Sequence, residues 1–284
     1  MRNVAFLTSA ELASLTADDR LAIAPLESRG VRVAPAVWTD ASVDWSAFDL
    51  VVVRSTWDWY VESGRFAKFL AALETRVRVE NRGARRWLDK RYLARLAEGG
   101  VRTVPTDVVA TEAELERALA KYDGTVVLKP ATAAGARSTV RFDAGDAARG
   151  REGLAAIAPG DVALLQPFVR EVEDVGEWSL IFFGGAFSHA LAKRPARGDF
   201  RVQEEFGGTV EPRTPPADVR AEAERALALA GERFLYARVD GIVSARFGGF
   251  CVTELEVVEP ELFLRVEPAA PERFASAIAA RLEP

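Results

Sequence analysis

Cysteine and histidine are nearly missing from this 284-residue chain, which has one of each, Cys251 and His189. One cysteine cannot form a disulfide within the chain, and these two residues cannot build a zinc site of the Cys/His type. We expect His189 to be a hydrogen-bonded structural residue, with a general-base role as the alternative, and Cys251 to be a small core residue. The chemistry must therefore come from Lys, Arg, Asp and Glu side chains and from bound ions.

Long apolar runs and concentrated positive charge are missing too. No segment approaches about 20 uninterrupted apolar residues, and the amino terminus meets a charge at Glu11, so neither a membrane span nor a secretory signal is expected. The net charge is −5 with both signs spread along the chain, whereas nucleic-acid binding needs a concentrated basic surface. We expect no membrane partner, no nucleic-acid partner and a cytoplasmic location.

The sequence also lacks two common nucleotide-binding motifs. After the first expected strand it reads LTSAEL, where a Rossmann dehydrogenase would carry GxGxxG, and the Walker A pattern GxxxxGK(S/T) occurs nowhere. Hydrophobic residues make up 49% of the chain, enough to fill the cores of two or three lobes. The alternation of expected strands and helices predicts an α/β protein with additional α+β lobes.

Residues 1–85 are expected to form an amino-terminal α/β lobe. Strands are expected at 4–7, 31–37 and 50–53, and helices at 18–29 and 62–73. The third strand is an unbroken apolar run, which suits a parallel sheet with binding residues beyond the strand end. Residues from the RSTWD stretch that follows, with one residue from near the carboxyl terminus, are the expected contacts of a small anionic or carboxylate substrate: Arg54, Ser55, Trp57, Asp58 and Arg265. The alternative is that the aromatic residues only fix the 62–73 helix.

Residues 86–165 are expected to form a small α+β subdomain with two notable lysines. Lys90 opens a helix at 89–98, where a solvated basic face is the alternative. Lys129 ends an apolar strand at 125–130, and a lysine that only extends its ammonium group into solvent is the alternative. The following loop, 131–139, has small side chains until Arg137, so backbone N–H groups there can approach phosphates; a mobile surface loop is equally compatible.

Residues 166–284 are expected to form the carboxyl-terminal subdomain. It begins with the QPFV sequence at 166–169, where proline interrupts strand pairing and leaves backbone groups free to bond an adenine edge. Hairpins are expected at 178–192 and 235–259, and helices at 216–230 and 271–282.

The second hairpin carries the acids that matter most. Side chains alternate along a strand, so Glu254 and Glu256 share one face. A three-residue loop at 247–249, or an equivalent bulge, would set Asp240 opposite Glu256 and turn four residues toward a core: Val239, Val243, Cys251 and Leu255. Three neighbouring carboxylates repel one another unless a cation lies between them, and oxygen ligands favour a hard ion such as Mg²⁺. A solvated acidic face is the alternative.

The order of these features resembles that of the ATP-grasp superfamily, in particular its glutathione-synthetase-like members. The features are, along the chain, the two lysines, the small-residue loop, the QPFV hinge, the acid after it, the basic segment LAKRPARGDFR and the acidic hairpin. The stretches VVVRSTWDW and ELEVVEPELFL are also similar to a subgroup of small ligases that includes a cyclo-ligase of cycloserine biosynthesis. The resemblance implies an ATP-grasp fold with a Rossmann-like pre-ATP-grasp domain at 1–85, a small lid subdomain at 86–165 and a carboxyl-terminal subdomain at 166–284.

The resemblance also implies ATP and Mg²⁺ as cofactors and a role for each matching residue. Asp240, Glu254 and Glu256 match magnesium ligands, and Lys193 and Arg201 match the catalytic basic residues near the γ-phosphate and the acyl group, together with Lys129. The expected nucleotide contacts are Lys90, Lys129, Gly135, Ser138, Gln166, Phe168, Val169 and Glu177, with Glu173 competing with Glu177 for the ribose. Two departures stand out: Glu256 replaces an Asn of many members, and Lys193 replaces an Arg.

The function that the resemblance implies is ATP-dependent ligation of a carboxylate and an amine through an acyl phosphate, between two small molecules or as ring closure within one. A small amino-acid-like substrate is expected. An ATP-grasp kinase that stops after phosphoryl transfer, and a nucleotide-binding protein without catalysis, are the alternatives. Dimers are common among such proteins, so a homodimer is left open.

Overall fold

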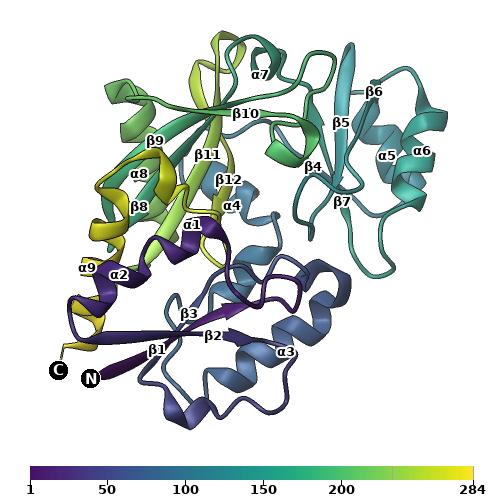
Figure 1. The fold of residues 1–284 in the computed structure, drawn as a ribbon. Coiled ribbons are helices and arrows are strands. Elements are labelled where there is room, and N and C mark those ends of the chain that lie inside the picture. Colours follow the sequence, from purple (N-terminus) through teal and green to yellow (C-terminus); the bar gives the residue numbers. More distant parts are fainter. Residues whose placement is uncertain (232, 284) are drawn as a thin grey trace.

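Three β-sheets organise residues 1–231 and 233–283, the part of the chain that the computed structural model describes (Figure 1). The amino-terminal sheet is parallel, in the order β2-β1-β3, with β1 (Arg2–Thr8), β2 (Val31–Val37) and β3 (Leu50–Val53). The predicted limits of the second and third strands are therefore confirmed. Strands β1 and β3 are mostly buried because helices and the carboxyl-terminal lobe cover the sheet, whereas the edge strand β2 is partly exposed.

The predicted 18–29 helix is broken in two, α1 (Ala17–Arg20) and α2 (Ile23–Glu27). Tertiary contacts explain the break, because both acids of α1 are buried and bonded to distant groups. Asp19 pairs with Arg54, and Asp18 accepts hydrogen bonds from the amides of Leu264 and Arg265. These bonds tie the start of the chain to its end and override the local helix pattern.

The second sheet is antiparallel, in the order β4-β7-β5-β6, and its members are β4 (Asp107–Val109), β5 (Thr125–Pro130), β6 (Val140–Asp143) and β7 (Ala163–Pro167). Two helices pack on it, α5 (Glu112–Leu119) and α6 (Ala147–Ala155). The sequence analysis missed β6 and α6. Gly150 and Gly153 weaken the helical pattern of α6, yet both are needed for close packing: a Cβ at Gly153 would lie 2.7 Å from Val140 Cγ2.

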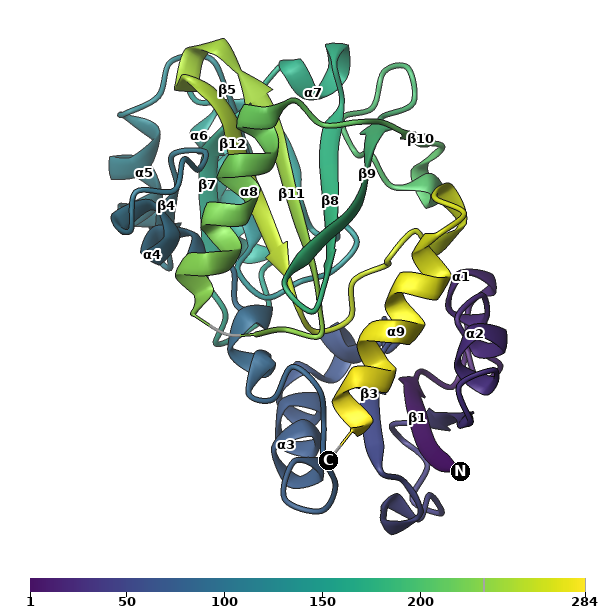
Figure 2. The same ribbon diagram turned by 90° about the vertical axis from the view of Figure 1, so that its left-hand side faces the viewer.

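The third sheet is antiparallel, in the order β10-β9-β8-β11-β12. Its members are β8 (Glu177–Phe183), β9 (Ala186–Arg194), β10 (Thr209–Pro212), β11 (Tyr236–Ser244) and β12 (Gly249–Glu256). Helix α8 (Ala217–Ala230) packs against β11 and β12, while α9 (Ala270–Leu282) lies between this sheet and the amino-terminal lobe (Figure 2). Phe274 of α9 contacts rings from both, Phe6 and Phe183, so the two lobes share one core.

The remaining elements are short or connect the sheets. They are helices α3 (Ser63–Leu73), α4 (Tyr92–Glu98) and α7 (Glu171–Asp174), and 3-10 turns at Trp45–Ala47, Trp59–Glu62, Ala84–Leu88, Glu204–Phe206, Ala245–Phe247 and Leu264–Val266. Among the described residues, no helix has the length and apolar character needed to cross a membrane.

A β-bulge sets the register of the β11–β12 hairpin. The loop is four residues long, 245–248, since Ser244 pairs with Gly249, so the predicted three-residue loop is wrong. This register alone would place Asp240 opposite Thr253 and on the other face from the two glutamates. An extra residue at Thr253 shifts the pairing, so Asp240 lies opposite Glu254. The equivalent bulge that the sequence analysis allowed is therefore present, and it places Asp240 opposite Glu254 rather than Glu256.

The same register corrects the expected position of Cys251. Val239 and Leu255 pair with each other and pack into the core beneath α8. Cys251 pairs instead with Ile242 and lies on the opposite face, in a separate cluster with Val169. It is buried, as expected, but not in the core that holds Leu255.

Candidate functional site

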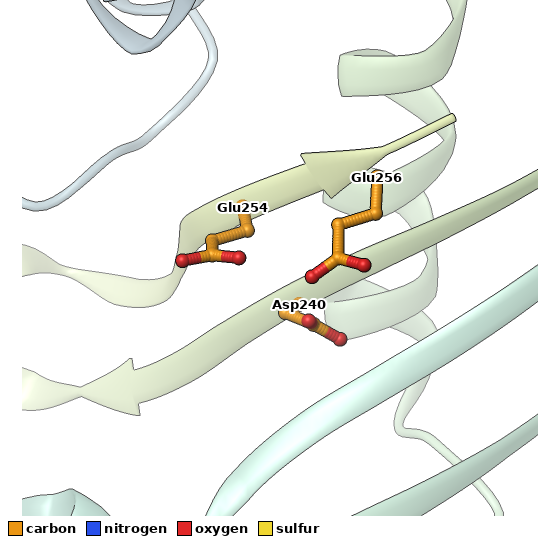
Figure 3. A group of neighbouring side chains, drawn as sticks. All are labelled: Asp240, Glu254 and Glu256. Atoms are coloured by element: carbon orange, nitrogen blue, oxygen red, sulfur yellow. The ribbon is translucent and has the colours of Figure 1, made fainter. Parts of the chain in front are cut away.

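Three carboxylates meet on one face of the β11–β12 hairpin. Glu254 and Glu256 extend from β12 and Asp240 from the neighbouring β11, and their side chains converge (Figure 3). One oxygen of each lies within 4.8 Å of the others. The distance suits a single ion between them, since oxygen ligands lie about 2.1 Å from Mg²⁺.

Lysines from two other parts of the chain reach the same face. Lys90 Nζ, from the residues before α4, lies 2.9 Å from Glu254 Oε1, and Lys129 Nζ, from the end of β5, lies 4.0 Å from the same atom. Lys193 Nζ, on β9, lies 3.5 Å from Asp240 Oδ2 and 2.7 Å from Glu177 Oε2. Charged side chains of the β4-β7-β5-β6 sheet and of the β10-β9-β8-β11-β12 sheet therefore meet at one site.

Arg238 completes the cluster and was missed by the sequence analysis. Its NH2 group lies 2.6 Å from Glu256 Oε1 and 3.0 Å from Asp240 Oδ2, and it is buried. The alternation of side chains along β11 was the signal that could have found it, because a residue two positions before Asp240 must share its face. Ser179 adds a hydroxyl that donates to Asp240 Oδ1 at 2.5 Å.

The charges of this cluster act on one another strongly. Burial alone would raise the pKa of Asp240, but Arg238 and Lys193 lower it below its usual value. Burial would also raise the pKa of Glu254, and Lys90 and Lys129 lower it well below its usual range. Burial raises the pKa of Glu256 to about 8, with Arg238 opposing the rise and Glu254 adding to it.

The donor set therefore fits a divalent cation. Without an ion, burial and the negative charge of its neighbours favour the protonated form of the Glu256 carboxylate. A hard cation held by three carboxylate oxygens would remove that repulsion. Asp240, Glu254 and Glu256 are the residues that could hold it.

Comparison with known proteins decides the family. Residues 89–261 match the model of the prokaryotic glutathione synthetase ATP-grasp domain, and residues 4–81 match that of the amino-terminal domain of the D-cycloserine synthetase DcsG. The chain belongs to the ATP-grasp family. It is an enzyme of the ATP-dependent, C–N bond-forming ligase type, and the fold predicted from the sequence is confirmed.

Individual relatives agree with this assignment. The cycloserine biosynthesis protein DcsG of Streptomyces lavendulae is 34% identical over 274 residues, which cover 90% of each chain. The crystal structure of D-cycloserine synthetase DcsG superposes with a TM-score of 0.90 at 32% identity, covering 99% of this chain and 100% of that one. D-alanine–D-alanine ligase from Bacillus anthracis shares the fold alone, with a TM-score of 0.69 at 15% identity over 99% of this chain and 98% of that one. The predicted likeness to the cycloserine subgroup is confirmed.

The small-residue loop of this ATP-grasp enzyme lies between lobes. Lys90 holds its first part, donating from its amide to Ala131 O and from Nζ to Ala133 O at 2.8 and 2.9 Å. Beyond it, Arg137 stacks 4.8 Å from the ring centre of Tyr60 in the amino-terminal lobe. Gly135 and Ser138 both adopt left-handed backbone angles, with φ of +63° and +53°. The loop is thus tightly turned and spans from Lys90 to the first lobe.

The predicted adenine contacts are partly occupied by the protein itself. The amide of Phe168 donates to Thr125 O at 2.9 Å, so this N–H is not free, contrary to the prediction. Gln166 Nε2 donates to Thr106 Oγ1 at 2.8 Å, and Val169 packs its side chain into the cluster with Cys251. The ring of Phe168 meets Phe200 edge to face, with centres 6.2 Å apart.

The two acids considered for the ribose lie in different places. Glu177 lies beside the carboxylate cluster, because it pairs with Lys193, and it accepts a hydrogen bond from Thr253 Oγ1 at 2.9 Å. Glu173, on α7, pairs with Arg141, whose guanidinium lies 4.8 Å from the ring centre of Phe168. Glu173 thus lies near the hinge residue Phe168, and Glu177 near the carboxylates.

Arg201 does not contact the carboxylate cluster. Its guanidinium forms a two-pronged pair with Asp199, at 2.7 Å between NH2 and Oδ2, and lies 3.8 Å from the ring centre of Phe206. Reaching the phosphates would require this segment to rearrange.

Most of the predicted substrate residues have structural partners. Arg54 is only 1% exposed and bonds Asp19 and Pro260 O, which contradicts a role in gripping substrate. Ser55 is also fully buried and pairs with Thr8 Oγ1. An apolar run followed by a charge signals a strand end, but it does not distinguish an arginine that faces a ligand from one that joins two lobes.

The other three predicted contacts differ in their surroundings. Trp57 Nε1 donates to Glu259 O at 3.0 Å, and Asp58 accepts from Trp38 Nε1 at 2.7 Å. Arg265 is partly exposed and pairs with acids from three segments, Asp18, Glu204 and Glu261. Of the five predicted residues, Trp57 is the one that bonds Glu259, three residues beyond the carboxylate of Glu256.

Proposed function

We propose that this enzyme joins a carboxylate carbon to an amine nitrogen, with release of ADP and phosphate, through an acyl phosphate. A small amino-acid-like molecule is the proposed substrate, and ring closure within it is the form that we favour. The relative named D-cycloserine synthetase, similar over the whole chain, supports ring closure. The observation that carries the ligase proposal is the convergence of Lys90 and Lys129 on Glu254 in the carboxylate face.

Each charged group has a proposed part in this chemistry. Asp240, Glu254 and Glu256 would hold Mg²⁺, which when bound neutralises charge on phosphate oxygens. Lys90 and Lys129 are proposed to bind the phosphates of ATP, and Lys193 and Arg238 to bind the reacting acyl oxygen, because all four cations lie beside the carboxylate cluster. Arg201 is proposed to join the γ-phosphate only after leaving Asp199.

The proposed nucleotide pocket lies along the hinge and the loop. Gln166, the chain at Phe168 and Val169, and Glu173 or Glu177 are proposed for adenine and ribose, and the loop with Gly135 and Ser138 for the phosphates. The division at 1–85, 86–165 and 166–284 remains our proposal for the domains, with the middle unit as the lid.

The two proposed steps need positioning rather than a protein nucleophile. First, a substrate carboxylate oxygen bonds to the γ-phosphorus while the bond to the β-phosphate oxygen breaks, and ADP leaves with that electron pair. Then the amine lone pair attacks the acyl carbon, phosphate leaves with the C–O electron pair, and the nitrogen loses a proton. The loop at 131–139 would exclude water from the acyl phosphate.

Trapping with hydroxylamine tests the proposal. Purified enzyme with ATP, Mg²⁺ and a panel of small amino acids should release ADP and give an acyl hydroxamate, because hydroxylamine attacks an acyl phosphate. A stable phosphorylated product without hydroxamate would indicate a kinase instead. No release of ADP with any member of the panel would contradict the proposed amino-acid-like substrate.

A further inference from the structure

The segment that follows β12, residues 257–262, is held by its backbone at every residue. Six consecutive carbonyl oxygens each accept a hydrogen bond from a distant side chain. The donors, in chain order of the carbonyls, are Asn81, Tyr236, Trp57, Arg54, Arg238 and His189, at 2.7 to 3.0 Å. We call this stretch the tail segment.

The tail segment fixes one side chain in particular, that of Glu259. Its carbonyl accepts from Trp57, and its carboxylate oxygen Oε1 accepts from Trp59 Nε1 at 2.5 Å. Trp59 is almost fully buried, so it holds the carboxylate from a rigid base. Both tryptophans belong to the amino-terminal lobe, the part that matches the D-cycloserine synthetase amino-terminal domain.

The second oxygen of Glu259 is available. Apart from the N–H of Glu259 itself, which bonds its own carboxylate, no described residue donates a hydrogen bond to Oε2, and this atom is not among the fully buried atoms that lack a partner, so it can accept a further hydrogen bond. Arg238 bonds both Glu261 O in the tail segment and Glu256 in the carboxylate cluster, at 3.0 and 2.6 Å, so the tail segment adjoins the cluster. A fixed carboxylate with one free oxygen is a binding group for a donor nitrogen.

We propose that Glu259 binds the amino group of the substrate, and that Trp59 is its positioning residue. The inference rests on the proposed function, which supplies an amino-acid-like substrate. The substrate's amine nitrogen donates to Oε2, while its carboxylate faces Lys193 and Arg238. Selection for the amino group thus depends on Glu259 of the tail segment, which tryptophans of the amino-terminal lobe hold in place, and not on the ATP-binding residues.

Matched ligand pairs test this assignment by binding, without turnover. Calorimetry in ADP and Mg²⁺ compares D-cycloserine with isoxazolidin-3-one, and serine, in D and L forms, with 3-hydroxypropanoate; the second member of each pair lacks the amino group. Wild-type protein should bind an amino member at least tenfold more tightly than its partner. Glu259→Gln keeps an acceptor for Trp59 but loses the charge, and should remove most of that discrimination, since a charge-assisted hydrogen bond is worth about ten- to hundredfold in affinity.

Control variants separate binding from folding. Trp59→Phe keeps the carboxylate but not its donor, and should lose part of the discrimination. Glu267→Gln, a half-exposed acid farther along the chain, should retain all of it. Affinity for ADP should be equal in all four proteins.

Two results would overturn the assignment, and they differ. Discrimination that persists in Glu259→Gln refutes the role of Glu259 and leaves the proposed function standing. Wild-type protein that binds no amino member better than its partner refutes both Glu259 and the amino-acid-like substrate.

Discussion

The tail segment and the small-residue loop both adjoin the carboxylate cluster, through Arg238 and Lys90 respectively, but they are held very differently. Every carbonyl from 257 to 262 is bonded to a side chain from another part of the fold. The loop apex, 134–139, bonds mainly to itself, and Arg137 on Tyr60 is its contact with the first lobe. The tail segment is thus held by groups from several parts of the fold, whereas the loop that we propose to cover the phosphates is held mainly by its own short turns, as expected of a segment that opens for nucleotide exchange.

The largest effect is expected from Arg54→Ala, which removes one of the side chains that hold the tail segment. Removing this guanidinium leaves the buried Asp19 carboxylate without its cation and Pro260 O without its donor. The free energy of unfolding should fall by about 3–5 kcal/mol, the usual cost of breaking a buried pair. Urea denaturation measures it, and the exposed Arg149→Ala is the matched control, expected to change stability by less than about 0.5 kcal/mol. Equal stabilities would show that the lobes are not joined through Arg54.

Lys129→Ala should mainly lower catalytic turnover, because Lys129 lies between the small-residue loop and the carboxylate cluster. Losing one electrostatic contact to the transferred phosphoryl group should raise the barrier by about 2–4 kcal/mol, and Glu254→Ala by a similar amount. Turnover would then fall about 30- to 1000-fold, measured by ADP release. Lys121→Ala, an exposed lysine on the same subdomain, serves as the control. Wild-type turnover in Lys129→Ala contradicts the assignment.

A smaller effect is expected on the loop side. Tyr60→Leu removes the aromatic face that Arg137 contacts, worth about 0.5–1 kcal/mol, so KM for ATP should rise about two- to fivefold. Tyr60→Phe keeps the aromatic face and should behave like wild type. Steady-state kinetics at varied ATP measures the change, and identical KM values for the Leu and Phe variants would remove Tyr60 from loop closure.

Cys251 probes the rigidity of the sheet without mutation. Burial raises the pKa of its thiol to about 11, so at pH 8 only about one molecule in a thousand carries the reactive thiolate. Iodoacetamide should therefore leave native protein unmodified over an hour and alkylate it fully in denaturant, as followed by mass spectrometry. Rapid alkylation of the native protein would mean that the hairpin opens readily.

The sequence was most informative where one local rule decides the structure. Alternation placed Glu254 and Glu256 together, and strand limits at 31–37 and 50–53 followed from apolar runs bounded by turns. It failed where distant contacts decide: the helix at 18–29 breaks because Asp18 and Asp19 bond groups elsewhere in the chain.

The candidate site shows the same limit. Strand alternation also places Arg238 on the face of Asp240, but no local sequence feature indicates that its guanidinium pairs with Glu256. Arg54 has the same sequence signature as a ligand-binding arginine, and only the packing of two lobes reveals its buried partners. The bulge at Thr253, on which the position of Asp240 depends, has no local signal that we could identify.

The most direct test of the central claim is a crystal structure with Mn²⁺ and a non-hydrolysable ATP analogue, because the anomalous signal of manganese locates the ion. The account predicts an ion bonded to oxygens of at least two among Asp240, Glu254 and Glu256, with Lys90 and Lys129 on the analogue's phosphates. An ion elsewhere, or phosphates that touch neither lysine, would contradict it.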